Sequence, residues 1–467
     1  MAISASCART EIAGRTPMLG ASRPRICAVE TAPQLVILLE CDRPLAGSSR
    51  HSLAGVDTVH LGRGSRRRAS RSRESRQLLL DLPDAWLSAV HARIVRRDGR
   101  WWIADAQSTN GTRVNGRPCA EACLEDGDVI EAGRTLLWFQ QAAPRQDADD
   151  EDGERIDGLT DGLATVAPAM SAAVATLPRI ARSSLPVVLL GETGTGKELV
   201  ARALHALSLR PGPFQALNCA AIPTTLLESE LFGARKGAFS GASEDRPGLV
   251  RVADRGTLLL DEVADLPLPA QAALLRFLQE SEVLPVGATR PVRVDVRVVA
   301  TAQTDLRSLV AAGRFRADLF ARLDAFTVRL PPLRERREDL GLVTAALLRK
   351  LAPDRCDAIR IAPEAALALF RHAWPLNVRE LEHSLAVALA VCNDSTIELA
   401  HLPEAVRKGG PGSSVVADGE RFREELLALL RRYRGNVAEV ARAFGKGRMQ
   451  VHRWAQRYDI DLASFRR

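Results

Sequence analysis

The residues with the clearest chemical potential in this chain form a glycine-rich loop and an acidic strand end, about seventy residues apart. The loop is Gly191-Glu192-Thr193-Gly194-Thr195-Gly196-Lys197-Glu198, and the acidic end is Leu258-Leu259-Leu260-Asp261-Glu262. The loop fits the pattern G-x-x-x-x-G-K, in which glycines let backbone N–H groups surround phosphates and the lysine reaches the terminal ones. Together with the acidic run, it predicts a nucleoside triphosphatase.

The surrounding sequence predicts the strand and the helix that such a loop needs. Residues 186–190 are expected to form a short buried strand, and residues 199–205 the helix that follows. The loop would then lie at a helix N-terminus, which favours anions. A plain glycine-rich turn is the alternative, and the acidic strand end argues against it.

Further segments extend this pattern over about half of the chain: residues 214–223, 227–233, 236–242, 313–323, 330–336 and 374–382. With the loop, they resemble the AAA+ domain of bacterial enhancer-binding proteins, the activators of sigma-54 RNA polymerase. In that family Gly-Lys-Glu is the normal end of the loop, so Glu198 fits although Ser or Thr usually stands there. The resemblance implies an α/β P-loop ATPase with a small helical lid over residues 158–407, using ATP and Mg²⁺.

The resemblance also implies a role for each chemically active residue. Lys197 and the loop N–H groups would hold the β- and γ-phosphates. Asp261 would hold Mg²⁺ through water, because Glu198 replaces the usual hydroxyl, and Glu262 would activate the attacking water. Asn218 resembles the residue that restrains this glutamate until a partner engages.

Three arginines complete the implied machinery. Arg316 and Arg322 resemble arginine fingers, which reach the γ-phosphate of a neighbouring subunit and offset charge in the transition state. Arg379 occupies the second-sensor position on the lid. Because fingers supplied by a neighbour leave a monomer incomplete, the resemblance implies a homo-oligomeric ring of six subunits. A surface salt bridge is the alternative role for Arg316 and Arg322.

Two motifs depart from the family pattern. The loop that contacts sigma-54 is usually Gly-Ala-Phe-Thr-Gly-Ala and here is Gly237-Ala238-Phe239-Ser240-Gly241-Ala242. Serine keeps the hydroxyl and loses a methyl group, so altered contact is expected rather than its loss. The first-sensor region, usually Ala-Thr-Asn, is Thr301-Ala302-Gln303, whose longer amide can still meet the γ-phosphate. Leu376 replaces a glycine, which the sequence does not explain.

The first module, residues 34–142, contains short β-rich runs separated by Gly, Asn and Asp turns, which predict an all-β sandwich. Its loops carry Gly62-Arg63, Ser88-Ala89-Val90-His91 and Ser108-Thr109-Asn110-Gly111-Thr112, and resemble a forkhead-associated (FHA) domain, which reads phosphothreonine. Arg63 and Ser88 would then hold the phosphate, Asn110, with Gly111 and Thr112 in its loop, would bind the peptide backbone, and His91 would brace the loops. A sandwich used only for oligomer contacts is the alternative.

One charged stretch lies within this module, between Arg63 and Ser88, and a second follows it. Arg66, Arg67, Arg68, Arg71, Arg73 and Arg76 form a basic stretch that either extends the phosphate-reading face or is a disordered solvated loop, and the second interpretation is favoured. Residues 143–157 contain an acidic run and predict a solvated linker. Residues 1–33 are an unassigned extension.

The last module, residues 419–467, follows a second linker at 408–418 and is expected to be all-α. Its third helix places apolar side chains on one face and a basic group largely elsewhere, which predicts a helix-turn-helix resembling the Fis-type DNA binders. For each basic residue an ordinary solvated position is the alternative. The residues expected to contact enhancer DNA are Arg448, Gln450, Arg453 and Arg457.

Composition agrees with a multidomain protein. The chain has 467 residues, of which 46% are hydrophobic, and a net charge of +7, which is compatible with a nucleic-acid partner. Its eight cysteines form no framework, so reduced thiols are expected. No segment has the roughly twenty apolar residues of a membrane span, and residues 1–33 lack a secretion signal, so a cytoplasmic protein without membrane partners is expected.

Three functions compete at this point. The favoured one is an ATPase that remodels the sigma-54 closed promoter complex, is recruited by enhancer DNA, and is regulated by a phosphothreonine-containing protein through the FHA domain. A DNA-bound phosphopeptide adaptor with a weak ATPase and an AAA+ remodeller of another target are the alternatives. Intact Lys197, Asp261 and Glu262 argue against the adaptor, and the Phe239 loop argues against another target.

Overall fold

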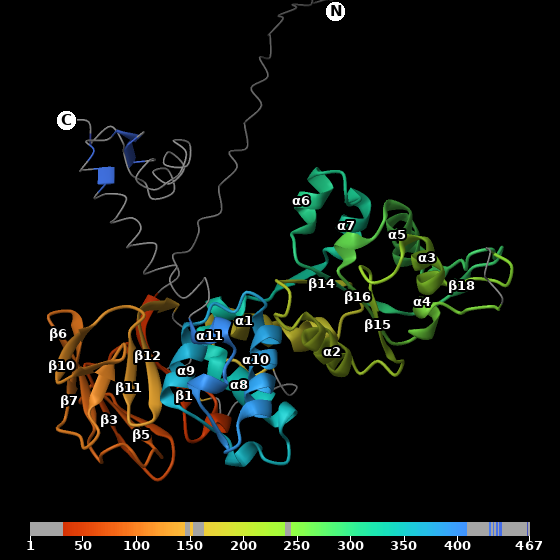
Figure 1. Ribbon diagram of the computed structural model, residues 1–467. Helices are drawn as coiled ribbons and strands as arrows, with labels where there is room; N and C mark the ends of the chain where they lie inside the picture. Colours follow the sequence, from red (N-terminus) through yellow and green to blue (C-terminus); the bar gives the residue numbers. More distant parts are fainter. Residues whose placement is uncertain are drawn as a thin grey trace, which may run out of the picture.

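The computed structural model describes residues 31–144, 150–152, 163–238 and 244–408, together with 429–430, 433, 436–437, 439–440 and 465. The predicted DNA contacts Arg448, Gln450, Arg453 and Arg457 and the predicted sigma-54 contacts 239–242 lie outside these residues. Along the chain come a β-sandwich, an α/β core and a helical lid (Figure 1). Among the described helices, none is both long and apolar enough for a bilayer.

The sandwich consists of two sheets that enclose a hydrophobic core. One sheet has seven strands in the order β13-β2-β1-β12-β11-β8-β9, and the other has six in the order β10-β7-β6-β3-β5-β4. Alternate residues of each strand point inward, so Ile37, Phe139 and Ile103 are fully buried between the sheets. The strands are β1 (Thr31–Glu40), β2 (Ser49–Ser52), β3 (Thr58–Arg63), β4 (Arg68–Ser72), β5 (Gln77–Leu82), β6 (Ala92–Arg97), β7 (Arg100–Asp105), β8 (Thr112–Val114), β9 (Arg117–Cys119), β10 (Glu121–Leu124), β11 (Val129–Ala132), β12 (Thr135–Pro144) and β13 (Asp150–Asp152).

The α/β core contains a parallel five-stranded sheet in the order β15-β16-β19-β14-β20. The middles of its central strands are apolar on both faces because helices cover both faces of the sheet. The strands are β14 (Val187–Leu190), β15 (Phe214–Asn218), β16 (Thr257–Asp261), β19 (Arg297–Ala302) and β20 (Phe326–Arg329), with a hairpin of β17 (Glu282–Val283) and β18 (Val292–Arg293). The helices are α1 (Pro168–Ala181), α2 (Lys197–Ser208), α3 (Thr224–Phe232), α4 (Leu249–Val252), α5 (Leu268–Glu280), α6 (Leu306–Ala311) and α7 (Ala317–Leu323).

The lid is a small helical unit that follows the core. It contains α8 (Leu340–Leu351), α9 (Pro363–Arg371), α10 (Asn377–Val391) and α11 (Glu404–Arg407), with β21 (Arg360–Ile361) paired to β22 (Thr396–Ile397). Figure 1 shows the sandwich against one side of the lid and the α/β core toward the other. One hydrophobic cluster joins residues of β1, β11 and β12 to residues of α8, α9 and α10.

The basic stretch is ordered, which corrects the expectation of a disordered loop. Residues Arg68–Ser72 form β4, which pairs with β5, and Arg67 is 4% exposed. Arg67 Nη2 lies 2.8 Å from Asp152 Oδ1, and Arg71 Nη2 lies 2.6 Å from Asp150 Oδ1. The arginine charge is therefore balanced by acidic residues far along the chain.

The expectation of a solvated linker over residues 143–157 is wrong for the three acidic residues of this segment that the structure describes. Asp150–Asp152 forms β13, which pairs antiparallel with β2 at the edge of the seven-stranded sheet. Glu151 also pairs with Arg50 at 3.1 Å. Hydrogen bonds from Arg71 and His51 hold the pKa of Asp150 below its usual value, against the effect of burial. An acidic run appears solvated when its sequence is considered alone, but here arginines of neighbouring strands form ion pairs with it.

Candidate nucleotide and phosphopeptide sites

The glycine-rich loop lies between β14 and α2, as the sequence predicts. Gly194 and Gly196 have φ angles of +76° and +101°, and a Cβ at Gly194 would lie 2.2 Å from the carbonyl oxygen of Leu376. Glycine is therefore required at 194 by both backbone conformation and space. The loop leads directly into the first turn of α2, and the N-terminus of a helix is suited to phosphate.

The side chains of Lys197 and Glu262 contact each other beside this loop. Lys197 Nζ donates to Gly191 O at 2.8 Å and lies 3.3 Å from Glu262 Oε1, while Gln303 Nε2 donates to the same carboxylate oxygen at 2.9 Å. Lys197 is 7% exposed. Side chains from three separate segments thus converge, including the glutamine that replaces the usual asparagine.

Asp261 lies at the carboxyl end of β16, beside Glu262. Thr301 Oγ1 donates to Asp261 Oδ1 at 2.6 Å and accepts from Glu262 N at 2.9 Å. Glu262 adopts φ +55°, an unusual conformation for glutamate, which turns its side chain away from the strand. The hard carboxylate oxygens of this pair, next to a phosphate-binding loop, fit Mg²⁺, which prefers one or two carboxylates together with phosphates.

The lid and the segment before it form hydrogen bonds with the glycine-rich loop through residues to which the sequence assigned no role. Asn377 is fully buried, and its amide nitrogen donates to Thr193 O at 3.0 Å and to Glu192 Oε2 at 3.2 Å. Arg334 forms two bonds with the Glu192 carboxylate, at 2.6 and 2.7 Å, which lower its pKa. Arg336 Nη2 donates to Thr195 O at 2.9 Å. The segments 330–336 and 374–382, which carry these residues, are both among the stretches that resemble the AAA+ family. The sequence therefore contained a signal for these contacts.

Arg379, the predicted second sensor, lies beside the glycine-rich loop. Val378 N donates to Gly194 O at 3.0 Å, and a Cβ on Gly194 would lie 3.1 Å from Arg379 Cβ. The Arg379 side chain is exposed beside the loop. Leu376, which the sequence did not explain, places its carbonyl against Gly194 and leaves its own side chain 51% exposed.

Two other predicted residues, Glu198 and Asn218, direct their side chains to partners outside the Lys197 cluster. Glu198 pairs with Arg202 on the next turn of α2, at 2.6 Å. Asn218 ends β15 next to Asp261, but its side-chain oxygen accepts from Ala220 N at 3.0 Å. The restraint on Glu262 in this structure therefore comes from Lys197 and Gln303.

The two predicted fingers are exposed at α7. Arg316 pairs with Asp318 at 2.7 Å, which raises the pKa of Arg316. Arg322 Nη2 donates to Leu278 O at 3.2 Å. Neither residue has a hydrogen bond to the phosphate-loop side chains of its own chain within the described residues. Their exposure leaves both guanidinium groups accessible to another molecule.

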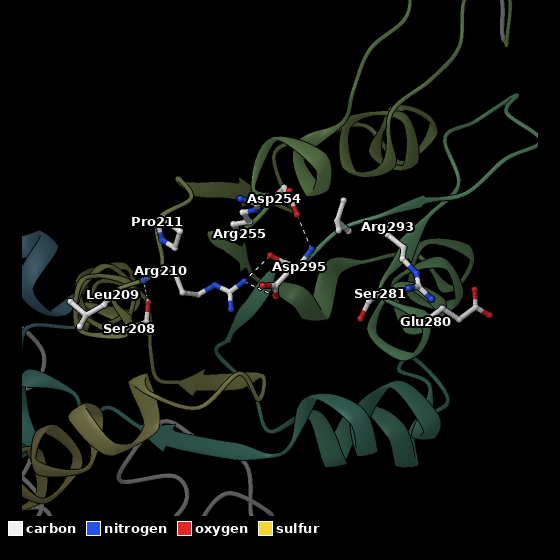
Figure 2. A pocket seen from close by; sticks show the side chains of 11 residues that line it. Ser208, Leu209, Arg210, Pro211, Asp254, Arg255, Glu280, Ser281, Arg293 and Asp295 are labelled. Atoms are coloured by element: carbon white, nitrogen blue, oxygen red, sulfur yellow. Dashed lines mark hydrogen bonds and ion pairs between the residues drawn. The ribbon is translucent and has the colours of Figure 1, made fainter.

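A cavity lies away from this cluster. It has a volume of about 740 Å³ and opens where the chain enters β15, β16 and β19, at the amino ends of the parallel strands. Figure 2 shows Arg210 directed toward Asp295, to which it pairs at 2.7 Å. Ligands of open α/β sheets bind at the carboxyl ends, so cavity size does not mark the site here.

The predicted phosphopeptide residues gather at one end of the sandwich. Arg63 N donates to Ser88 O at 2.9 Å, and Thr109 N donates to Ser88 Oγ at 3.1 Å. Asn110 Nδ2 donates to Trp86 O at 2.7 Å. The exposed Arg63 guanidinium forms no ion pair with the described residues. Guanidinium, hydroxyl and amide groups thus share one loop cluster.

The side chain of His91 stabilises the loop that carries Ser88. It is fully buried, and its Nδ1 accepts from Ser88 N at 3.2 Å, which requires that nitrogen to be unprotonated. Burial lowers the pKa of His91 and so favours the neutral ring. Thr112 Oγ1 donates to Asp105 Oδ1 at 2.7 Å, while Gly111 takes φ +72° in open space.

Comparison with known proteins agrees with this arrangement. Three family models match: the sigma-54 interaction domain over residues 163–329, the AAA+ ATPase lid domain over 334–419 and the FHA domain over 59–133. The DNA-binding transcriptional regulator NtrC of Salmonella typhimurium is 42% identical over 329 residues, which are 64% of this chain and 70% of that protein. The chain belongs to the family of sigma-54-dependent transcriptional regulators.

Other relatives share less of their length with this sigma-54-dependent regulator. The acetoin catabolism regulatory protein of Cupriavidus necator is 43% identical over 65% of this chain and 48% of that protein. The response regulator PilR of Pseudomonas aeruginosa is 45% identical over 56% of this chain and 60% of that protein. The chain thus spans about half to three fifths of these two proteins. NtrX of Brucella abortus, crystallised with ADP, is 32% identical, with a TM-score of 0.49, over 63% of this chain and 69% of that one.

The predicted fold class is confirmed for the FHA sandwich and the AAA+ core with its lid. Most of the predicted helix-turn-helix, including its third helix, lies outside the described residues. The six described cysteines are free thiols, as expected.

Proposed function

We propose that this regulator hydrolyses ATP to remodel the sigma-54 RNA polymerase closed complex, under the control of a phosphothreonine-containing protein. The observation that carries the proposal is the cluster of Lys197, Asp261, Glu262 and Gln303 at the carboxyl ends of the central strands, next to a loop that the lid holds. No other cluster in the described part of the chain combines an anion-binding loop with paired carboxylates.

Each residue has a role that its position supports. Lys197, now bonded to Glu262 and Gly191 O, would turn to the β- and γ-phosphates and release the glutamate. Glu262 would then accept a proton from the attacking water, while Gln303 positions its carboxylate. Asp261 would hold Mg²⁺, which neutralises phosphate charge when bound.

The exposed fingers support a ring. Arg316 would leave Asp318 to reach the nucleotide of a neighbouring subunit, and an ion pair that is exposed to solvent in this way is easily broken. Arg322 would accompany it from the same helix. We therefore include a homo-oligomeric ring, of six subunits by family resemblance, in the proposal.

The FHA cluster supports recognition of phosphothreonine. Arg63 at the end of β3 is exposed and has no ion pair among the described residues, and Ser88 lies on the adjacent loop; a guanidinium and a hydroxyl form charge-assisted bonds with a phosphate dianion. Asn110 would bind the backbone of the same peptide. The assignment of Phe239 to sigma-54 contact and of Arg448 and Arg453 to enhancer DNA rests on the sequence alone.

One experiment tests the proposal at its centre. Purified full-length protein should hydrolyse ATP, Lys197→Ala should abolish ATP binding, and Glu262→Ala should keep binding while turnover stops. Hydrolysis by Glu262→Ala at the wild-type rate would remove the catalytic assignment. Turnover without any binding of sigma-54 in a transition-state analogue complex would instead favour an AAA+ remodeller of another target.

A further inference from the structure

The outer face of the FHA sandwich is built to pack against the lid. In β1, Leu35 and Ile37 enter the sandwich core, whereas Val36 and Leu38 enter the cluster that contains the lid helices. In β12, Trp138 likewise turns outward, and its ring meets Phe370 of α9 edge-on at 5.4 Å. A sandwich with a solvated face would alternate apolar and polar residues, so these strands are apolar on both faces for a reason.

Backbone contacts make the interface specific. Gly341 N of α8 donates to Ser48 Oγ at 3.0 Å, and Ile361 N of β21 donates to Cys41 O at 2.9 Å. A Cβ on Gly341 would lie 2.2 Å from Leu38 O. Glycine inside a helix costs roughly 0.5–1 kcal/mol relative to alanine, so the close approach of two backbones explains its presence.

The segment that leads from the core into this interface also holds the phosphate loop. Arg334 and Arg336 bind Glu192 and Thr195 O, as described above. Two residues later, Glu338 is 7% exposed and hydrogen-bonds Gln140 of the sandwich. One short segment therefore contacts the nucleotide loop at its beginning and the FHA domain at its end.

A second chain of contacts joins the lid to the phosphopeptide loops. Asp84, next to the loop that carries Trp86 and Ser88, accepts from Arg134 N at 2.7 Å and Thr135 Oγ1 at 2.9 Å. Arg134 O accepts from Cys41 N at 2.9 Å, and Cys41 O accepts from Ile361 N of the lid. A continuous series of hydrogen-bonded residues thus joins the phosphopeptide loops to the lid.

We propose that the FHA domain and the lid form a single rigid body, and that this interface is the route by which a ligand of the FHA domain changes nucleotide binding. The regulatory half of this inference rests on the proposed function. A lid that carries the FHA domain cannot reposition over the phosphate loop without moving it, so the two ligands act on the same equilibrium. Such coupling is reciprocal: each ligand changes the affinity for the other by the same factor.

The test uses full-length protein with two interface variants and a matched control. Trp138→Ala removes the contact with Phe370 and leaves the sandwich core, whereas Gly341→Ala adds the clashing methyl group and favours the lid helix. Trp102→Ala is the control, because Trp102 is a half-buried tryptophan on the other sheet of the sandwich. Hydrogen exchange of β1 and α8 reports the interface, and titration with a fluorescent ADP analogue reports the nucleotide site.

We expect both interface variants to speed exchange in β1 and α8 and to change the ADP dissociation constant by at least about fivefold, with the control within about twofold of wild type. Unchanged exchange in both variants would overturn the rigid body. Faster exchange with wild-type ADP affinity would overturn its link to the nucleotide site.

A phosphothreonine peptide library then separates this inference from the proposed function. In the wild type, ADP should change the affinity for a selected peptide, and the interface variants should bind that peptide with an affinity that ADP no longer changes. Peptide binding that ignores ADP in the wild type contradicts the coupling alone. Complete absence of peptide binding contradicts the proposed recognition of phosphothreonine, and the ADP titration still decides whether the interface controls the nucleotide site.

Discussion

Asn377 is the residue whose replacement should reveal most about how the lid holds the phosphate loop. It is fully buried, takes φ +56°, and accepts from Leu333 N at 2.7 Å while its amide donates to Glu192 and Thr193 O. Asn377→Ala removes these bonds and leaves the Leu333 N–H buried without a partner, which costs about 1–3 kcal/mol. Alanine also lacks the tolerance of asparagine for this backbone conformation, which adds about 1 kcal/mol.

Together these two costs lower the free energy of unfolding by about 2–4 kcal/mol. This corresponds to a decrease of roughly 5–15 °C in the melting temperature of a unit the size of the α/β core with its lid. Calorimetry of the full-length protein measures it, and His383→Ala, an exposed change on the same helix, serves as the control. Asn377→Asp keeps the acceptor for Leu333 N but faces Glu192 with a second carboxylate. We therefore expect it to weaken ADP binding more than it lowers the melting temperature. Melting and ADP binding of Asn377→Ala that match the control would refute the reasoning.

Three further outcomes are expected. Lys197→Ala should lose nucleotide binding and Glu262→Ala only turnover, because one residue holds phosphate and the other activates water; binding by filter assay and phosphate release measure the two steps. Arg63→Ala should abolish discrimination between phosphorylated and unphosphorylated threonine peptides in calorimetry, and discrimination that survives would leave an oligomerisation sandwich. Burial raises the pKa of the Glu338 carboxyl to about 7. Between about pH 4.5 and 7 the folded protein keeps a proton on Glu338 that the unfolded chain has lost, so the free energy of unfolding should fall as the pH rises through this range. Glu338→Gln should flatten that decrease in urea unfolding, and an unchanged pH profile would contradict it.

The sequence was most informative where chemistry depends on short motifs. The glycine-rich loop from Gly191 to Glu198 lies between the expected strand and helix, and the acidic pair lies at the end of the expected apolar strand β16, because local strand and turn patterns position them. Asn377 was missed as a loop contact because its partners are about 185 positions away along the chain.

Long-range pairing explains the remaining errors. The basic stretch around Arg67 and the acidic run at Asp150–Asp152 each appear solvated when read separately, yet they neutralise each other across the sheet edge. The interface between sandwich and lid was also missed. Its signal was present in β1, where every position from Leu35 to Leu39 is apolar, unlike the alternation of a strand with one solvated face.

The most direct test of the central claim is the binding of sigma-54 to the full-length protein loaded with ADP and aluminium fluoride, which imitates the transition state of hydrolysis. The account predicts a stable complex with the wild type, and no complex with Phe239→Ala, whose ATP hydrolysis should remain largely intact. Failure of the wild type to bind sigma-54 while it hydrolyses ATP, or equal binding by Phe239→Ala, would contradict it.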